Sequence, residues 1–180
     1  MRRLGAIIAG GKASRFGGDK PAALLNGRTL IDHVAGGLRG QTHHMIICGR
    51  HSANVESVAD HPSPDLGPLG GLNAALLYAC EHGFDAVVSA GCDVLPVPQM
   101  PVTTDTDAAM FLDGHYLFGI WPASLARSLD RHLSSQSDHS MRRWIAVTGA
   151  QSFAANMRHY NLNTKADLVQ YAATLQAGST

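Results

Sequence analysis

The sequence predicts a three-layer α/β domain with a mostly parallel central sheet. Short apolar runs alternate along the chain with segments of helical period, and this alternation is typical of a parallel sheet with helices on both faces. The first apolar run, Leu4–Ile8, ends in a glycine-rich loop, as a buried parallel strand should. With 180 residues, the chain is long enough for one domain with a real core and short for two.

Six segments are expected in the first half of the chain. Strands are predicted where apolar residues run together, and helices where they recur at three- and four-residue spacing. Thr29 has the side chain and the position to cap the first helix. In order, the segments are a strand at Leu4–Ile8, a helix through Leu30, Val34 and Leu38, a strand at Met45–Cys48, a loop with three prolines at Pro62–Pro68, a helix at Gly71–Glu81 and a strand at Ala86–Ala90.

The second half is predicted to open with a hairpin. Asp113-Gly114 is a two-residue turn signal between two apolar runs. The elements expected there are strands at Ala108–Leu112 and Tyr116–Ile120, helices at Ala123–Leu133 and Met141–Thr148, a strand near Phe153, and a last helix that starts after Asn163-Thr164 and runs to Leu175.

Composition excludes several classes of function. Fourteen basic and fourteen acidic side chains balance, whereas a general nucleic-acid binder needs a basic excess. No apolar run approaches the length of a membrane span, and the first one stops at Gly10-Gly11, too early for a signal core. The three cysteines are odd in number and widely spaced, which favours reduced thiols in the cytoplasm and no zinc site.

The segment Ala9–Lys20, AGGKASRFGGDK, has the composition of a triphosphate cradle. Its four glycines let backbone N–H groups approach anionic oxygens, and Lys12, Arg15 and Lys20 add three cations. A P-loop is excluded because Lys20 follows an aspartate and precedes a proline, and the dinucleotide fingerprint is excluded because the first two glycines are adjacent. The alternative is a mobile surface loop with solvated charges.

This opening, together with Leu24–Leu30 (LLNGRTL), resembles that of the molybdenum cofactor nucleotidyltransferases. Ile8 and Phe16 stand where that family has leucine and methionine, and the double glycine at Gly10-Gly11 favours its guanylyltransferase branch. The resemblance implies a Rossmann-like nucleotidyltransferase fold in a single domain, residues 1–180. Its nucleotide-binding half would span about residues 1–100, and its acceptor-binding half about residues 101–180.

Two further segments carry the resemblance in the first half. Gly67–Gly71 (GPLGG) is similar to the family's Gly-Pro-Leu-Ala-Gly beside the base and ribose, although a helix entry with proline near its start would look the same. Asp60 falls where the family has a nucleotide-binding aspartate, and it suits either the guanine N1–H and N2–H donors or a ribose hydroxyl. Asp93, directly after a predicted strand, resembles the family's magnesium-ligating aspartate; capping of a turn is the alternative.

The C-terminal Asn161–Asp167 segment (NLNTKAD) resembles the family's pterin-binding ending. Asparagine amides suit a pterin edge, and a helix cap by Asn163 or Thr164 is the alternative or additional role. The middle of the chain departs from the family pattern, because Tyr116 follows His115 where a proline is usual and no arginine precedes it. Arg142-Arg143 are either solvated or placed to meet the acceptor's phosphate.

The resemblance therefore implies that the chain transfers GMP from GTP to molybdopterin and releases pyrophosphate, with Mg²⁺ as cofactor. Molybdoenzyme chaperones are candidate partners; nucleic acid and membrane are not. The alternatives are transfer from CTP or to another phosphorylated acceptor, and a non-catalytic nucleotide-binding relative. The expected catalytic residues are Lys20, Arg15 and Asp93, with Asp93 as the metal ligand, and the expected ligand-binding residues are Ile8, Ala9, Gly10, Gly11, Lys20, Asp60, Gly70, Asn161 and Asn163.

Overall fold

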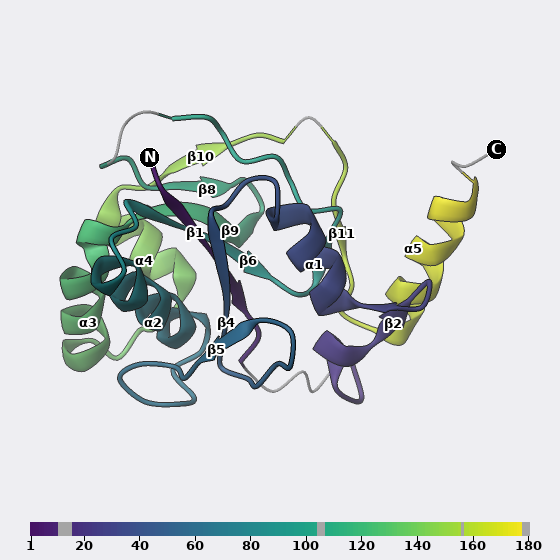
Figure 1. Ribbon diagram of the computed structural model, residues 1–180, viewed down its shortest axis with the longest axis horizontal. Helices are drawn as coiled ribbons and strands as arrows, with labels where there is room; N and C mark the ends of the chain where they lie inside the picture. The colour runs from purple at the N-terminus through teal and green to yellow at the C-terminus, as the bar shows by residue number, and fades with distance from the viewer. Residues whose placement is uncertain (11–15, 104–106, 156, 178–180) are drawn as a thin grey trace.

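The computed structural model of the chain describes residues 1–10, 16–103, 107–155 and 157–177. Its centre is one sheet of seven strands (Figure 1). In chain order, these strands are β1 (Arg3–Ile8), β4 (His44–Cys48), β5 (Glu56–Val58), β6 (Ala86–Gly91), β8 (Met110–Leu112), β9 (His115–Pro122) and β10 (Gln151–Phe153). Two small sheets pair β2 (Leu24–Leu25) with β3 (Arg28–Thr29), and β7 (Val94–Leu95) with β11 (Tyr160–Asn161).

The strand order in the large sheet is β10-β8-β9-β6-β1-β4-β5. Neighbours are parallel except where β9 runs antiparallel to both β6 and β8. The hairpin expected at Asp113-Gly114 is the β8–β9 connection, in which Gly114 has a φ of 75°. The prediction of a mostly parallel α/β sheet is therefore confirmed.

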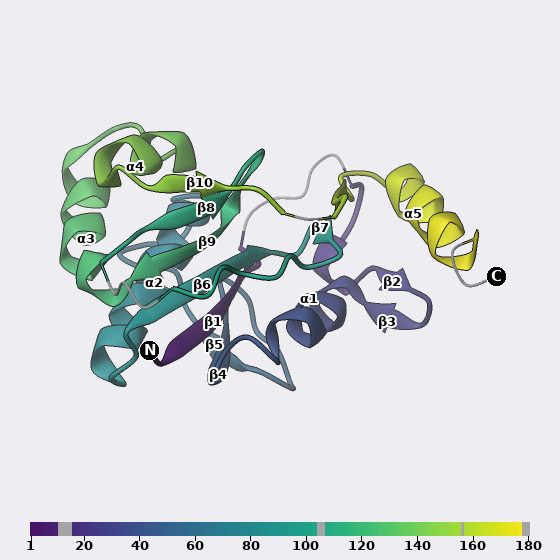
Figure 2. The ribbon, with the colours of Figure 1, turned by 90° about the horizontal axis from the view of Figure 1, so that it is seen from above.

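Helices cover both faces of this sheet (Figures 1 and 2). The covering helices are α1 (Leu30–Leu38), α2 (Pro68–Glu81), α3 (Ala126–Ser135) and α4 (Met141–Thr148). The chain also forms α5 (Lys165–Ala177) and the short 3₁₀ turns η1 (Lys20–Ala22) and η2 (Ala123–Leu125). Because side chains alternate along a strand, β1 supplies both cores. Leu4, Ala6 and Ile8 pack in the core under α2, α3 and α4, whereas Ile7 packs in the core under α1.

Local signals explain the helix starts. Thr29 accepts a hydrogen bond from the Asp32 N–H at 3.1 Å and caps α1, as predicted. Helix α2 begins at Pro68, three residues before the expected Gly71, because Gly67 takes a φ of 64° and Pro68 supplies no N–H that would need a partner. None of the helices in the described ranges combines the length and hydropathy that a membrane crossing requires.

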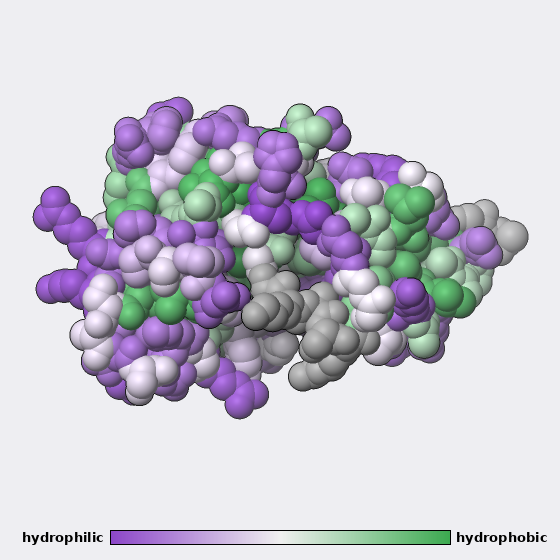
Figure 3. All heavy atoms as spheres, turned by 90° about the horizontal axis from the view of Figure 1, so that it is seen from below, coloured by the Kyte–Doolittle hydropathy of each residue, from purple (hydrophilic) through white to green (hydrophobic). Residues whose placement is uncertain are grey.

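Helix α5 lies apart from the body of the sheet (Figures 1 and 2). Tyr171 is its one buried residue among those described, and Val169 is 71% exposed. Seen from below, apolar surface gathers on the part of the molecule that carries α5 and β2, whereas the opposite part is mainly hydrophilic (Figure 3). The contacts of α5 with the core come from its middle, where Leu168, Tyr171 and Ala172 pack against the cluster under α1.

Candidate functional site

The carboxyl ends of three neighbouring strands meet at one edge of the sheet. In the register of the parallel strands, Ile8 lies between Cys48 and Gly91, and the Ala9 N–H donates to the Cys48 carbonyl at 3.0 Å. The residues that follow these strands share that edge, where ligands of open α/β sheets bind. Ile8 and Ala9 are themselves at most 9% exposed, so a ligand can reach them mainly through their backbone.

Glycines pack closely around the carboxylate of Asp60. A Cβ on Gly10 would lie 2.9 Å from Asp60 Oδ2, and one on Gly49 would lie 2.6 Å from Gly10 Cα. Two glycines of α2 also face Asp60. A Cβ on Gly70 would lie 3.4 Å from Asp60 Cβ, and a Cβ on Gly71 would lie 3.3 Å from Asp60 Oδ1. At Gly10, Gly49 and Gly71 a Cβ would come within 3.0 Å of a neighbouring atom, so these three positions require glycine, whereas the contacts at Gly70 are looser.

Asp60 is an unsatisfied acceptor in this arrangement. Its Oδ1 is buried and has no hydrogen-bond partner among the described residues. Burial, with a smaller contribution from the charge of Asp65, raises the pKa of the Asp60 carboxyl. A buried carboxylate oxygen without a donor costs free energy, so this atom is suited to a ligand that brings an N–H or O–H group.

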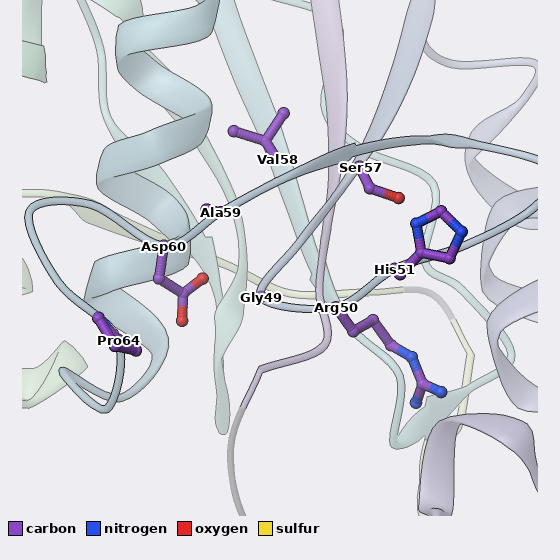
Figure 4. Close-up of a pocket in the computed structure, with 8 residues that line it drawn as sticks. All are labelled: Gly49, Arg50, His51, Ser57, Val58, Ala59, Asp60 and Pro64. Carbon is purple, nitrogen blue, oxygen red and sulfur yellow. The ribbon is translucent and has the colours of Figure 1, made fainter.

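A pocket of about 350 Å³ lies beside Asp60. It is lined by Gly49, Arg50, His51, Ser57, Val58, Ala59, Asp60 and Pro64 (Figure 4). In Figure 4 the Asp60 carboxylate faces Gly49, and the Arg50 side chain extends away from Asp60. The pocket therefore offers an acceptor at one side and backbone from the β4–β5 loop at the other.

Lys20 is held between two chain segments that are distant in sequence. Its Nζ lies 3.2 Å from Asp93 Oδ2 and donates to Asn163 Oδ1 at 3.0 Å. The residue is only 8% exposed. A buried ammonium needs such partners, and here they hold it at the same sheet edge as Gly10.

The C-terminal segment reaches Asp93 through short strand pairing. Strand β11 pairs antiparallel with β7, directly after Asp93, and the Leu162 N–H donates to the Asp93 carbonyl at 2.7 Å. Asp167 then accepts the N–H groups of Asn163 and Thr164 at 2.9 and 2.8 Å. Thr164 Oγ1 accepts the Asp167 N–H at 3.1 Å, so Thr164 caps α5 and the Asn163 side chain is left to bind Lys20.

A second pocket, of about 250 Å³, adjoins the other side of Asp93. Asn161 and His115 line it, with Asp93, Val94, Gly114, Tyr116, Leu117, Phe118 and Met141. Burial and the neighbouring His159 lower the pKa of His115. The Arg142 guanidinium carbon lies 5.3 Å from the centre of the Tyr116 ring, a cation–π distance. The pocket thus combines an amide, a neutral imidazole and aromatic surface.

The donor set is compatible with a hard divalent cation that arrives with a nucleotide. The side chain of Asp93 is 38% exposed, and one of its oxygens, Oδ2, is paired with Lys20. Nowhere in the described part of the chain do three His, Cys, Asp or Glu side chains gather as a metal cage. Mg²⁺ is commonly held by one or two carboxylates, phosphate oxygens and water, and Asp93 fits that pattern.

The thiols near the site are poorly suited to act as nucleophiles. Burial raises the pKa of Cys92 to about 11 and that of Cys48 to about 12, so both are protonated at neutral pH. Catalytic cysteines require the thiolate. Among the described residues of this edge, Lys20, the carboxylates and the backbone are therefore the groups better suited to act on a ligand.

Two predicted site residues fall outside the part of the chain that the structure describes, and two residues without a predicted role lie at the site. The first two are Gly11 and Arg15. Arg50 and Asp167 had no predicted role, and each contacts a predicted site residue or its neighbour. Arg50 has one signal in common with Asp60 and Asp93, because all three follow a strand at its carboxyl end.

Comparison with known proteins finds a matching family and several relatives of this chain. The model of the MobA-like NTP transferase domain matches residues 5–156. A molybdenum cofactor guanylyltransferase from Cereibacter sphaeroides is 31% identical and covers 98% of this chain and 98% of its own length. A second protein of that name, from Bradyrhizobium sp., is 30% identical over 92% of this chain and 90% of its own.

Solved structures share the fold. Molybdopterin-guanine dinucleotide biosynthesis protein A from Archaeoglobus fulgidus superposes with a TM-score of 0.69 at 18% identity, covering 97% of this chain and 99% of its own. A UTP-bound UGPase from Acinetobacter baumannii superposes with a TM-score of 0.70 at 11% identity, covering 97% and 93%. At these identities the likeness concerns the fold.

Proposed function

This chain belongs to the MobA-like NTP transferase family, and we propose that it transfers GMP from GTP to molybdopterin with release of pyrophosphate. The observation that carries the proposal is the position of Lys20, whose ammonium lies between Asp93 and Asn163 at the carboxyl edge of the sheet. Asp93 belongs to the predicted nucleotide-binding half and Asn163 to the predicted acceptor-binding half, and both contact this one cation. A charge held there can act on the phosphates that pass between the two substrates.

The reaction forms one bond and breaks one. A terminal phosphate oxygen of molybdopterin attacks the α-phosphorus of GTP, and the bond from that phosphorus to the bridging oxygen of pyrophosphate breaks. The nucleophile is already ionised, so no general base is required. The protein contributes positioning and neutralisation of charge, and we assign these roles to Lys20, the backbone at Gly10 and the predicted residues Gly11 and Arg15.

The pocket beside Asp60 supports guanine as the base. The Asp60 carboxylate is acceptor-only when ionised, and guanine presents two adjacent donors, N1–H and N2–H. Cytosine presents one exocyclic donor next to the acceptor N3, which would face the carboxylate unfavourably. A ribose hydroxyl is the second group that Asp60 is suited to accept from, and it would not discriminate between bases.

The pocket that adjoins Asn161 supports the acceptor site. It lies against Asp93 on the side that faces β9 and α4, and amide and imidazole groups suit the polar edge of a pterin. Arg142, close to this pocket through Tyr116, is placed to attract the acceptor's phosphate. Asn163 differs from Asn161, because its amide oxygen already binds Lys20.

We further propose that Asp93 holds Mg²⁺. When bound, this ion would neutralise the phosphates of the nucleotide and polarise the α-phosphorus. Asp93 would hold the ion through its carboxylate, and Lys20 beside it would neutralise phosphate oxygens. We also propose that the protein is cytoplasmic and that molybdoenzyme chaperones are its partners.

Thermal unfolding with each nucleoside triphosphate and Mg²⁺ tests the nucleotide site. A ligand at a hundred times its Kd stabilises the fold by about 2.7 kcal/mol, which corresponds to a rise in Tm of roughly 5–10 °C for a chain of this size. We expect this rise with GTP and a smaller one with ATP, CTP and UTP. A larger rise with CTP or UTP would contradict the assignment of the base.

Turnover with molybdopterin tests the reaction itself. We expect the dinucleotide and one equivalent of pyrophosphate from wild-type protein, with glucose 1-phosphate as a control acceptor that gives neither. Asn161→Ala should raise the KM for molybdopterin and leave the Kd for GTP unchanged. Binding of GTP without product would favour the alternative of a non-catalytic relative.

A further inference from the structure

Arg50 and Asp19 form an ion pair with two parallel hydrogen bonds. Nη1 of Arg50 donates to Asp19 Oδ1 at 2.7 Å, and Nη2 donates to Oδ2 at 2.8 Å. This geometry fixes the plane of the guanidinium relative to the carboxylate, which a single contact would not do. The arginine lowers the pKa of Asp19, and the aspartate raises that of Arg50, so both remain charged at neutral pH.

The pair joins two parts of the site. Arg50 follows Gly49, whose backbone is fixed because a Cβ there would lie 2.6 Å from Gly10 Cα. Asp19 directly precedes Lys20, and its carbonyl accepts the Ala22 N–H at 3.2 Å, which starts the turn η1. The pair therefore ties the turn that carries Lys20 to the end of β4.

The pair with Arg50 is the main contact of the Asp19 side chain. Asp19 occupies the N-cap position of η1 without forming a side-chain cap hydrogen bond, and the Ala22 N–H makes only the smallest contribution to lowering its pKa. The Arg50 and Asp19 side chains are 28% and 54% exposed, and two parallel hydrogen bonds are the geometry in which a part-exposed pair can still order its surroundings. Both carboxylate oxygens accept from this one arginine.

We propose that Arg50 is a positioning residue that holds, through Asp19, the turn from which Lys20 reaches Asp93. This inference rests on the proposed function for its effect on catalysis, because it assumes that Lys20 acts on the transferring phosphates. The rival role is direct binding of a nucleotide phosphate by Arg50. The two roles give opposite expectations for Asp19→Asn.

If the pair positions Lys20, Asp19→Asn should lower kcat by about tenfold to a hundredfold, the scale for misplacing a catalytic group. The Kd for GTP should stay the same or become lower, because a negative charge has been removed near the phosphates. If Arg50 instead binds phosphate, Asp19→Asn frees it, and kcat should not fall. An unchanged or higher kcat in this variant would overturn the proposal.

The exchanged pair adds a rescue test. Arg50→Asp alone should lower kcat as Asp19→Asn does, and the double variant Asp19→Arg with Arg50→Asp should recover part of the loss. A direct phosphate ligand would not be recovered when the charge is moved to position 19. Glu56→Gln is the matched control, since it removes the charge of a carboxylate that contacts His44 of β4 and accepts from Tyr78 of α2, and it should leave kcat unchanged.

Chemical labelling measures the position of Lys20 without turnover. The chain has three lysines, Lys12, Lys20 and Lys165, so acetylation of each is resolved by mass spectrometry. We expect Lys20 to react several-fold faster in Asp19→Asn than in the wild type, with Lys165 unchanged in both. Equal labelling rates at Lys20 in the wild type and in Asp19→Asn would overturn the proposal. If Lys20 is labelled faster in Asp19→Asn but the wild-type protein makes no dinucleotide, only the proposed function is refuted.

Discussion

Replacing Lys20 with methionine separates catalysis from folding. Methionine is unbranched and uncharged and is one atom shorter than lysine, so it fills most of the same space without reaching Asp93 and Asn163 with a charge. The attraction between unit charges 3.2 Å apart is about 1 kcal/mol at the dielectric constant of water and about 5 kcal/mol at a constant of 20. Since the Asp93 side chain is 38% exposed, solvent screens the pair, and the lower part of that range applies.

The expected loss of stability is accordingly small. Lys20→Met removes the ion pair, but it also removes the cost of burying an ammonium that is only 8% exposed. We expect the free energy of unfolding to change by about 1 kcal/mol, or roughly 2–4 °C in Tm. Turnover should fall much further, by about two to three orders of magnitude, as when one preorganised transition-state contact is lost.

Steady-state rates at saturating GTP and molybdopterin, measured beside thermal unfolding, provide the test. Lys165→Met is the control, because Lys165 is exposed at the start of α5 and should change neither quantity. A rate for Lys20→Met within a factor of about three of wild type would remove Lys20 from the mechanism, given the size of the expected loss. A large drop in Tm would instead show that Lys20 is mainly structural.

Three further predictions concern Asp93, Gly10 and Asp60. Asp93→Asn keeps the size but loses the charge that hard cations require, so transfer should nearly stop and its Mg²⁺ titration should flatten; an unchanged titration would exclude the metal role. Gly10→Ala places a Cβ 2.9 Å from Asp60 Oδ2. It should weaken GTP binding, measured by calorimetry, by about tenfold, the scale of one lost hydrogen bond. Gly18→Ala is the control, because nothing lies within 4 Å of the added Cβ, and it should leave GTP binding unchanged. Burial raises the pKa of Asp60, so stability is lost as pH rises through that pKa. Asp60→Asn should therefore raise Tm at neutral pH, but not at about pH 3, where the carboxyl is protonated in both the folded and the unfolded state. The same variant should weaken GTP binding. A lower Tm at neutral pH would contradict the burial argument.

Periodicity predicted the elements that depend on local sequence. The strand at Leu4–Ile8 and the turn at Asp113-Gly114 need only apolar alternation and turn residues, and both are confirmed. Strands β2, β3, β5, β7 and β11 were not predicted; they have two or three residues each, too few for the alternation that identifies a strand. Such a short strand can be stabilised by pairing with a distant strand. Strand β11 pairs with β7, which lies more than sixty residues earlier in the chain, and a local sequence pattern cannot predict this pairing.

The site divides in the same way. Gly10 and Asp93 were singled out because they follow predicted strands and Asp60 because of its place in the family pattern, and the structure brings all three to one edge of the sheet. Their roles remain predictions. The partners of Lys20 and Asp19 could not be predicted, because they depend on how Asn163 and Arg50 are oriented after the chain has folded.

The bond between Lys20 and Asn163 also bears on how the protein matures. The two residues are 143 positions apart, and contacts of such long range form late because they carry the largest loop-closure entropy. During synthesis the chain emerges N-terminus first, so the sheet and the Asp60 pocket can assemble before Asn163 exists. Lys20 would gain its second partner only when β11 docks on β7 and α5 is capped. A chain that ends near Met157 should therefore bind GTP and yet be unable to transfer it, so that nascent protein is kept inactive until its last segment has been made.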